Sequence, residues 1–165
     1  IKKVKPMGLI AVYPGTFDPI TNGHVDLANR GCKLFSKVVI AVAKNPQKNT
    51  LFTIDERVGL IEEIFNKDNN VEVYPLDSLL VDFAASHDAS VILRGLRAVS
   101  DFEYEVQLAS MNRSLSPAIE SVFMSPAEKY SFLSSSIIKD IARHHGNIDG
   151  FVHQAVATAL KNKFE

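Results

Sequence analysis

The chain has 165 residues and a formal net charge of −1 at pH 7. A chain of this length most simply forms one domain, predicted here over residues 1–165, and can bury about 68–70% of its unfolded surface. The balanced charge excludes the electrostatic footprint of a nucleic-acid or anionic-membrane partner. The single cysteine, Cys32, excludes an internal disulfide and is expected to be a buried thiol.

The N-terminus imitates a secretory signal, because three lysines precede an apolar run. Pro14 and Gly15 end that run too early for a signal core, which needs about 7–15 apolar residues. No stretch approaches the ~20 apolar residues of a membrane span. We therefore expect a cytoplasmic protein. Residues 1–6 are either native or an extension ahead of Met7, and both alternatives stay open.

Five apolar runs, several rich in β-branched residues, predict buried strands. In chain order they cover residues 9–13, 37–43, 71–75, 90–93 and 119–124. Segments with helical spacing separate the runs, so strands and helices alternate. This alternation predicts parallel strands with right-handed crossovers, and hence an α/β, Rossmann-like open five-stranded sheet with helices on both faces.

Six helices are expected between and after these strands. The first carries apolar residues at helical spacing: Val25, Ala28, Cys32 and Phe35. Capping boxes at residues 53–56 and 100–103 predict the starts of the second and fourth helices. A short third helix is expected from about residue 79, ending near residues 87–88. The fifth follows a serine run and ends at Gly146, and the sixth carries Val152 and further apolar residues.

Residues 13–24, with the sequence YPGTFDPITNGH, connect the first strand to the first helix. In an open parallel sheet such a connection is where phosphate-bearing ligands bind. Gly15 and Gly23 let a phosphate approach the backbone closely. His24 lies on the first helical turn, at the positive end of the helix, which favours a phosphate contact over a surface role.

Three more polar loops follow predicted strands, at residues 44–50, 94–97 and 130–136. In a parallel sheet they converge with residues 13–24 on one edge. They offer cations and hydroxyls but few carboxylates: Lys44, Lys48, Arg94, Arg97, Ser134, Ser135 and Ser136. This set suits polyphosphate binding and phosphate transfer, although one serine is expected to cap a helix instead. No Walker A or G-x-G-x-x-G motif occurs, which disfavours P-loop NTPases and dinucleotide dehydrogenases.

Residues 15–24 resemble the first signature of the nucleotidyltransferase superfamily, and residues 134–136 resemble its second motif. Residues 94–105 (RGLRAVSDFEYE) and 130–136 (YSFLSSS) are more specific and resemble the bacterial phosphopantetheine adenylyltransferase family. The resemblance covers nearly the whole chain. It implies transfer of an adenylyl group from ATP to 4′-phosphopantetheine, giving dephospho-coenzyme A and pyrophosphate, the penultimate step of coenzyme A biosynthesis, with Mg²⁺.

The resemblance also implies roles for individual residues. His24 would be catalytic, stabilising the transition state of an in-line attack. ATP contacts are implied for Thr16, Phe17, His24, Gly95, Leu96, Arg97, Glu105, Tyr130, Ser131, Phe132, Leu133, Ser134, Ser135 and Ser136. Phosphopantetheine contacts are implied for Thr16, Lys48, Leu80 and Arg94. The family is typically a homohexamer inhibited by coenzyme A, which no residue pattern here shows.

Two departures from the pattern are minor: Thr21 stands where the superfamily often has histidine, and Tyr130 where some relatives have tryptophan. Two rival functions stay open. One is the same chemistry with another acceptor, such as nicotinamide mononucleotide, or glycerol phosphate with CTP. The other is a nucleotide-sensing module without catalysis, which the presence of His24, Lys48 and both arginines disfavours.

Overall fold

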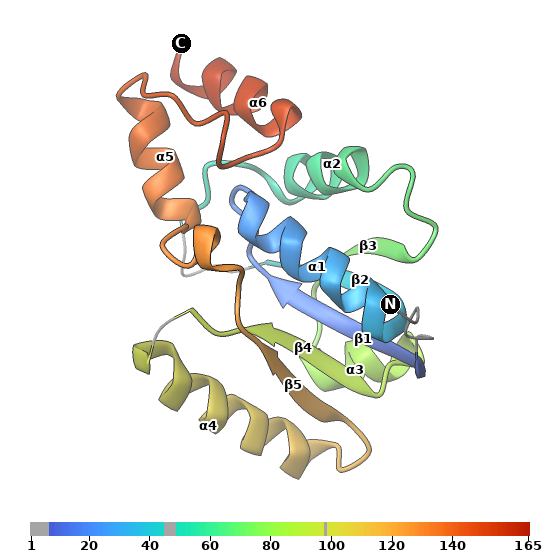
Figure 1. Cartoon of the computed structure of the whole chain (residues 1–165). Coiled ribbons are helices and arrows are strands. Elements are labelled where there is room, and N and C mark those ends of the chain that lie inside the picture. The colour runs from blue at the N-terminus through green and yellow to red at the C-terminus, as the bar shows by residue number, and fades with distance from the viewer. Residues whose placement is uncertain (1–6, 45–48, 98) are drawn as a thin grey trace, which may run out of the picture.

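The structure, a computed structural model, describes residues 7–44, 49–97 and 99–165 (Figure 1). Its centre is one parallel sheet with the strand order β3-β2-β1-β4-β5. The strands are β1 (Met7–Gly15), β2 (Phe35–Ala43), β3 (Val71–Leu76), β4 (Val91–Gly95) and β5 (Glu120–Met124). The predicted α/β, Rossmann-like open sheet is confirmed.

Helices cover both faces of the sheet, as the alternation predicts (Figure 1). One face carries α1 (Asn22–Leu34), α2 (Ile54–Ile64), α5 (Ser135–Arg143) and α6 (Gln154–Phe164). The other carries α3 (Leu80–Ser86) and α4 (Val99–Leu115), and a 3-10 turn, η1 (Glu128–Tyr130), precedes α5. None of the described helices is long and apolar enough to cross a bilayer.

The core has two layers because successive strand residues point to opposite faces. On β2, Val38, Ile40 and Val42 join the larger cluster, which also contains side chains of α1, α2, α5 and α6. Val39 and Ala41 join the smaller cluster on the side of α3. Both faces of this strand are therefore buried, as expected for a central strand of a parallel sheet.

Several predicted boundaries are wrong. Phe35 begins β2 instead of ending the first helix, although it is buried as expected. The fourth helix begins at Val99 and already includes Ser100, so Ser100 is not the N-cap residue that the predicted capping box requires. The fifth helix ends at Arg143, before Gly146, and Val152 precedes the sixth helix while still packing in the core. Phe35 and Val152 are thus buried as their apolar character predicts, although they lie outside the helices to which the pattern assigned them.

Cys32 is half-buried instead of fully buried, at the end of α1 where it packs against the core. Burial, with a smaller contribution from Asp68, raises the pKa of its thiol to about 11. A thiol with this pKa is protonated at neutral pH, which supports the expectation that Cys32 is not a nucleophile.

The capping box at the start of α2 is confirmed. The Thr53 hydroxyl accepts from the Glu56 backbone N–H at 3.2 Å, and the Glu56 carboxylate accepts from the Thr53 N–H at 2.8 Å. We expect Thr53→Ala to lower the free energy of unfolding by about 1 kcal/mol in a urea titration. Thr53→Ser keeps the hydroxyl and serves as the control. Equal stability of the Ala variant and the wild type would contradict the role of the cap.

Candidate functional site

A cleft of about 710 Å³ opens beyond the carboxyl ends of the strands. Its walls come from the ends of β1 and β4, the start of α1, the inner side of α4 and the segment that leads into α5. Strands β1 and β4 are neighbours, but their connections leave through α1 on one face and α4 on the other. This divergence leaves a crevice, and ligands of open α/β sheets bind at such a point.

Most of the predicted site residues lie in the lining of this one cleft. They are Thr16, Phe17, His24, Leu80, Arg94, Gly95, Arg97, Glu105, Tyr130, Leu133, Ser134, Ser135 and Ser136. Three of the four loops expected to share one edge, at residues 13–24, 94–97 and 130–136, therefore converge. Lys48 lies outside the described residues, and Lys44 is not part of the lining.

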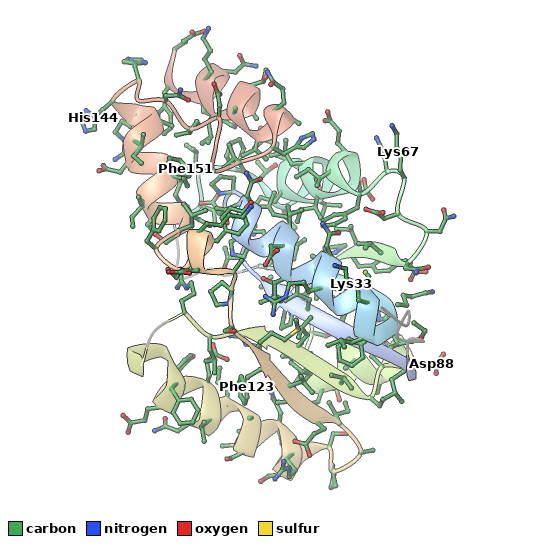
Figure 2. All side chains as sticks on the ribbon, in the orientation of Figure 1. Lys33, Lys67, Asp88, Phe123, His144 and Phe151 are labelled. Atoms are coloured by element: carbon green, nitrogen blue, oxygen red, sulfur yellow. The ribbon has the colours of Figure 1, made fainter. Side chains whose placement is uncertain are left out.

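Three predicted ATP contacts do not line the cleft: Leu96, Ser131 and Phe132. The Ser131 hydroxyl donates to the Glu128 carbonyl at 2.8 Å, which closes η1. Phe132 is 59% exposed, and its ring contacts Phe151, which is labelled in Figure 2, with a centroid distance of 6.1 Å. The structure thus separates these side chains from their neighbours Tyr130 and Leu133.

Sequence reasoning missed several lining residues, and most of them fall into two groups. Tyr104 and Leu108 on α4 flank Glu105, and helical periodicity places all three on one side of that helix. Ala43 and Leu76, at the ends of β2 and β3, join Leu80 in lining the cleft. Their positions follow from the strand order, which periodicity alone does not reveal.

Phe17 organises the loop after β1 from the inside. Its backbone adopts a φ of 49°, and its ring is 3% exposed. A Cβ at Gly15 would lie 2.8 Å from this ring, so the ring position requires glycine there. The ring also makes edge contacts with Tyr13 at 5.3 Å and His24 at 5.2 Å between centroids. Phe17 therefore supports the imidazole from the side.

Backbone geometry sets the orientation of His24. Its Nδ1 accepts from the Thr21 N–H at 3.0 Å and lies 3.0 Å from the Thr21 hydroxyl oxygen. An Nδ1 that accepts a hydrogen bond in the neutral ring leaves the proton on Nε2. Burial, followed by the charge of Arg97, lowers the pKa of His24 to about 4. At neutral pH the ring is thus an uncharged N–H donor in the wall of the cleft.

Arg94 and Glu105 face each other inside the cleft. The guanidinium Nε and Nη2 donate to the two carboxylate oxygens at 2.6 and 2.5 Å. Nη1 donates to the Pro14 carbonyl at 3.4 Å. Arg94 lies within β4 and not in the loop expected after it. Arg97 does lie beyond the strand, and it donates to the Leu133 carbonyl at 3.1 Å.

The serine run divides into three different environments. Ser134 caps α5 by accepting from the Ile137 N–H at 3.2 Å, so the expectation of one capping serine is confirmed. The Ser135 hydroxyl donates to the Pro19 carbonyl at 2.8 Å and joins α5 to the loop after β1. Ser136 lies in the lining of the cleft. The free N–H groups of the first turn favour an anion at this helix start.

Arg57 is a structural residue that sequence reasoning missed. It is 3% exposed, and its Nη1 donates to the Thr16 carbonyl at 2.6 Å and the Ala43 carbonyl at 3.0 Å. Its Nε donates to the Thr53 carbonyl at 3.3 Å. Arg57 therefore ties the ends of β1 and β2 to the start of α2. The available signal was a charged residue four positions before Ile61, on the apolar side of the predicted helix.

The fold and the cleft together have the form of a Rossmann-like nucleotidyltransferase domain. The chain belongs to the cytidylyltransferase-like family, whose model matches residues 12–141, within the nucleotidyltransferase superfamily.

Two solved structures share the fold. One is a protein of Vibrio parahaemolyticus provisionally named a nicotinate-nucleotide adenylyltransferase, with 17% identity, a TM-score of 0.72, and coverage of 96% of this chain and 97% of that one. The other is a lipopolysaccharide core biosynthesis protein of Thermoplasma volcanium GSS1, with 22% identity, a TM-score of 0.57, and coverage of 73% and 98%.

The lowered pKa of His24 predicts a specific loss of stability in acid. Between pH 6.5 and 4 the unfolded chain binds a proton at this residue and the folded chain does not, so stability falls as the pH falls. From pH 7.5 to 4.5 the free energy of unfolding should lose up to about 2.5 kcal/mol through His24.

Urea titrations across this pH range measure the effect. We expect the free energy of unfolding of His24→Gln to decrease less than that of the wild type. His144→Gln, which removes an exposed imidazole, is the matched control. The same pH dependence in the His24 variant and the wild type would contradict a neutral His24 in the folded chain.

Proposed function

We propose that this protein transfers the adenylyl group of ATP to 4′-phosphopantetheine, forming dephospho-coenzyme A and pyrophosphate. The observation that carries the proposal is the convergence of a neutral His24 N–H, two arginines and the start of α5 in one cleft. Membership of the family supports nucleotidyl transfer. The resemblance of residues 94–105 and 130–136 to phosphopantetheine adenylyltransferases supports this particular acceptor.

The lining of the cleft supports two phosphorylated substrates, one of them with an apolar part. Arg94, Arg97 and the N-terminus of α5 provide N–H donors for phosphate oxygens. Ala43, Leu76 and Leu80 provide an apolar wall at the ends of β2 and β3. A flexible aliphatic amide arm suits such a wall, whereas a second nucleoside would call for polar groups that recognise its ring and ribose.

The proposed reaction is a direct displacement. An oxygen of the acceptor phosphate attacks the α-phosphorus of ATP and forms the new P–O bond. The bond between the α-phosphorus and the bridging oxygen breaks, and pyrophosphate leaves with the electron pair. The attacking oxygen is already anionic, so positioning and charge stabilisation suffice without a general base. His24 donates its Nε2 proton as a hydrogen bond to an α-phosphate oxygen, where negative charge builds up.

Mg²⁺ is proposed from the resemblance alone. Among the described residues no group of three or more His, Cys, Asp and Glu side chains is placed to hold a metal ion. Glu105 is the carboxylate among the cleft-lining residues, and it is paired with Arg94. The described residues therefore do not fit a dedicated protein site. Mg²⁺ commonly enters such reactions on substrate phosphates.

A homohexamer, inhibition by coenzyme A and a cytoplasmic location also follow from the resemblance. One feature supports self-association. The outer helix α4 exposes large apolar side chains, with Phe102 at 54%, Met111 at 59% and Leu115 at 53%. Such side chains on one exposed helix suit a contact with further copies of the chain. Tyr104 and Leu108, which line the cleft, share one side of α4 with Met111 and Leu115, so this contact would adjoin the site.

An acceptor panel tests the proposed function. The protein is incubated with ATP and Mg²⁺ and, separately, with 4′-phosphopantetheine, nicotinamide mononucleotide or nicotinate mononucleotide, while pyrophosphate is measured. A parallel reaction contains CTP and glycerol phosphate. We expect release with 4′-phosphopantetheine only. Release of pyrophosphate with another acceptor, and not with 4′-phosphopantetheine, would assign that acceptor as the substrate. Binding of both substrates without release of pyrophosphate in any reaction would favour a sensing module.

A second test addresses His24. We expect His24→Ala to lower kcat by about 10²–10³-fold, because one preorganised donor to the developing charge is lost. The dissociation constant for ATP, measured by calorimetry, should change far less. Turnover near the wild-type value would contradict the assigned role.

A further inference from the structure

Asp18 forms a buried junction between three segments that surround the cleft. The residue is 4% exposed, and its Oδ1 accepts from the Phe52 N–H at 2.9 Å. Its Oδ2 accepts from the Leu51 N–H at 3.0 Å and from the Lys139 ammonium at 2.5 Å. The loop after β1, the chain leading into α2, and α5 therefore meet at a single carboxylate.

The junction is ionised at neutral pH. Burial alone would raise the pKa of Asp18, but the hydrogen bonds from Lys139, Phe52 and Leu51 lower it below its ordinary value. A buried carboxylate needs such donors, since loss of the cation leaves an uncompensated charge. The ionised carboxylate therefore depends on Lys139, because without this ammonium group the buried negative charge would have no cation beside it.

Helix α5 is attached to the loop after β1 at two adjacent points. Ser135 donates to the Pro19 carbonyl, and Lys139 pairs with Asp18. Ser135 and Lys139 are four residues apart and thus lie one turn apart on the same face of α5. They bind two consecutive residues of the loop, Pro19 and Asp18. Two contacts one turn apart fix both the rotation of the helix and its position along the loop.

Both attached segments carry groups of the site. His24 lies in the first turn of α1, which follows the loop after β1, and Ser136 lies next to Ser135. We propose that Asp18 and Lys139 are positioning residues, whose ion pair holds the serine-bearing start of α5 in register with His24. The inference rests on the proposed function for its kinetic readout. Lys139 itself does not line the cleft, so it acts through the segments it joins.

The test compares Lys139→Met with Lys139→Arg, which keeps the charge. A helix start displaced by about 1 Å costs up to about 10²-fold in rate. We expect Lys139→Met to lower kcat/KM by about 10–10²-fold, with a higher KM for ATP, and Lys139→Arg to recover most of the loss. Lys161→Met is the matched control, because Lys161 forms an exposed ion pair with Glu165, with 3.3 Å between the charged atoms, at the end of α6. Its kinetic constants should stay at the wild-type values.

A double variant separates positioning from folding. Asp18→Asn/Lys139→Met leaves no uncompensated buried charge, so it should fold even where Lys139→Met alone does not. We expect it to keep the kinetic loss. Wild-type kcat and KM in the folded double variant, judged by circular dichroism, would show that the pair serves folding alone and would overturn the proposal.

Calorimetric titration with ATP, without an acceptor, distinguishes this inference from the proposed function. We expect the double variant to bind ATP about tenfold more weakly than the wild type, as displaced donors predict. If the wild type binds ATP but transfers nothing to 4′-phosphopantetheine, the proposed function fails and the ratio of dissociation constants still decides the positioning role. A wild type that binds no ATP overturns both.

Discussion

The site depends on one buried carboxylate. Asp18 comes from the loop after β1, yet its hydrogen bonds reach the chain before α2 and the middle of α5. A charge in this environment is stable only with its donors in place. Its burial therefore links segments more than 100 residues apart in the chain, since Lys139 lies 121 positions from Asp18. Apolar packing brings these segments together, and the carboxylate sets their register.

The second constraint is the electrostatic state of His24. Burial, followed by the charge of the nearby Arg97, lowers the pKa of this ring, and its place at the start of a helix acts in the same direction. The ring is thus preorganised as a neutral donor, with its tautomer set by the Thr21 backbone. A group in this state needs no proton transfer to meet a phosphate oxygen, which suits a reaction governed by positioning.

The arginines show how the same residues carry structural and functional demands. Arg94 is held by Glu105 on two of its nitrogens, so its orientation in the cleft is determined before any ligand arrives. Arg57 holds the ends of β1 and β2 through carbonyl oxygens and contacts the site only through the backbone. A planar guanidinium with several donors suits both tasks, and lysine does not reproduce either geometry.

The sequence by itself determined the fold class and identified most of the polar residues that line the cleft. Continuous apolar runs identify the strands and helical spacing identifies the helices, because burial acts on the side chains of an element, and polar loops after parallel strands must share one edge. Local rules also predicted the Thr53 cap and the single capping serine. These features depend on neighbours in the chain, so a short window contains their cause.

Only the tertiary structure decided which partner each polar group takes. The pairing of Asp18 with Lys139, the carbonyls held by Arg57 and the contact of Phe17 with Gly15 and His24 depend on the packing of the helices on the sheet and on the path of the loops. The same holds for Phe132, which faces Phe151 instead of the cleft. Such contacts either join residues that are distant in the chain or depend on the path that a single loop takes. No local pattern encodes them, because their energies exist only once the core has brought the segments together.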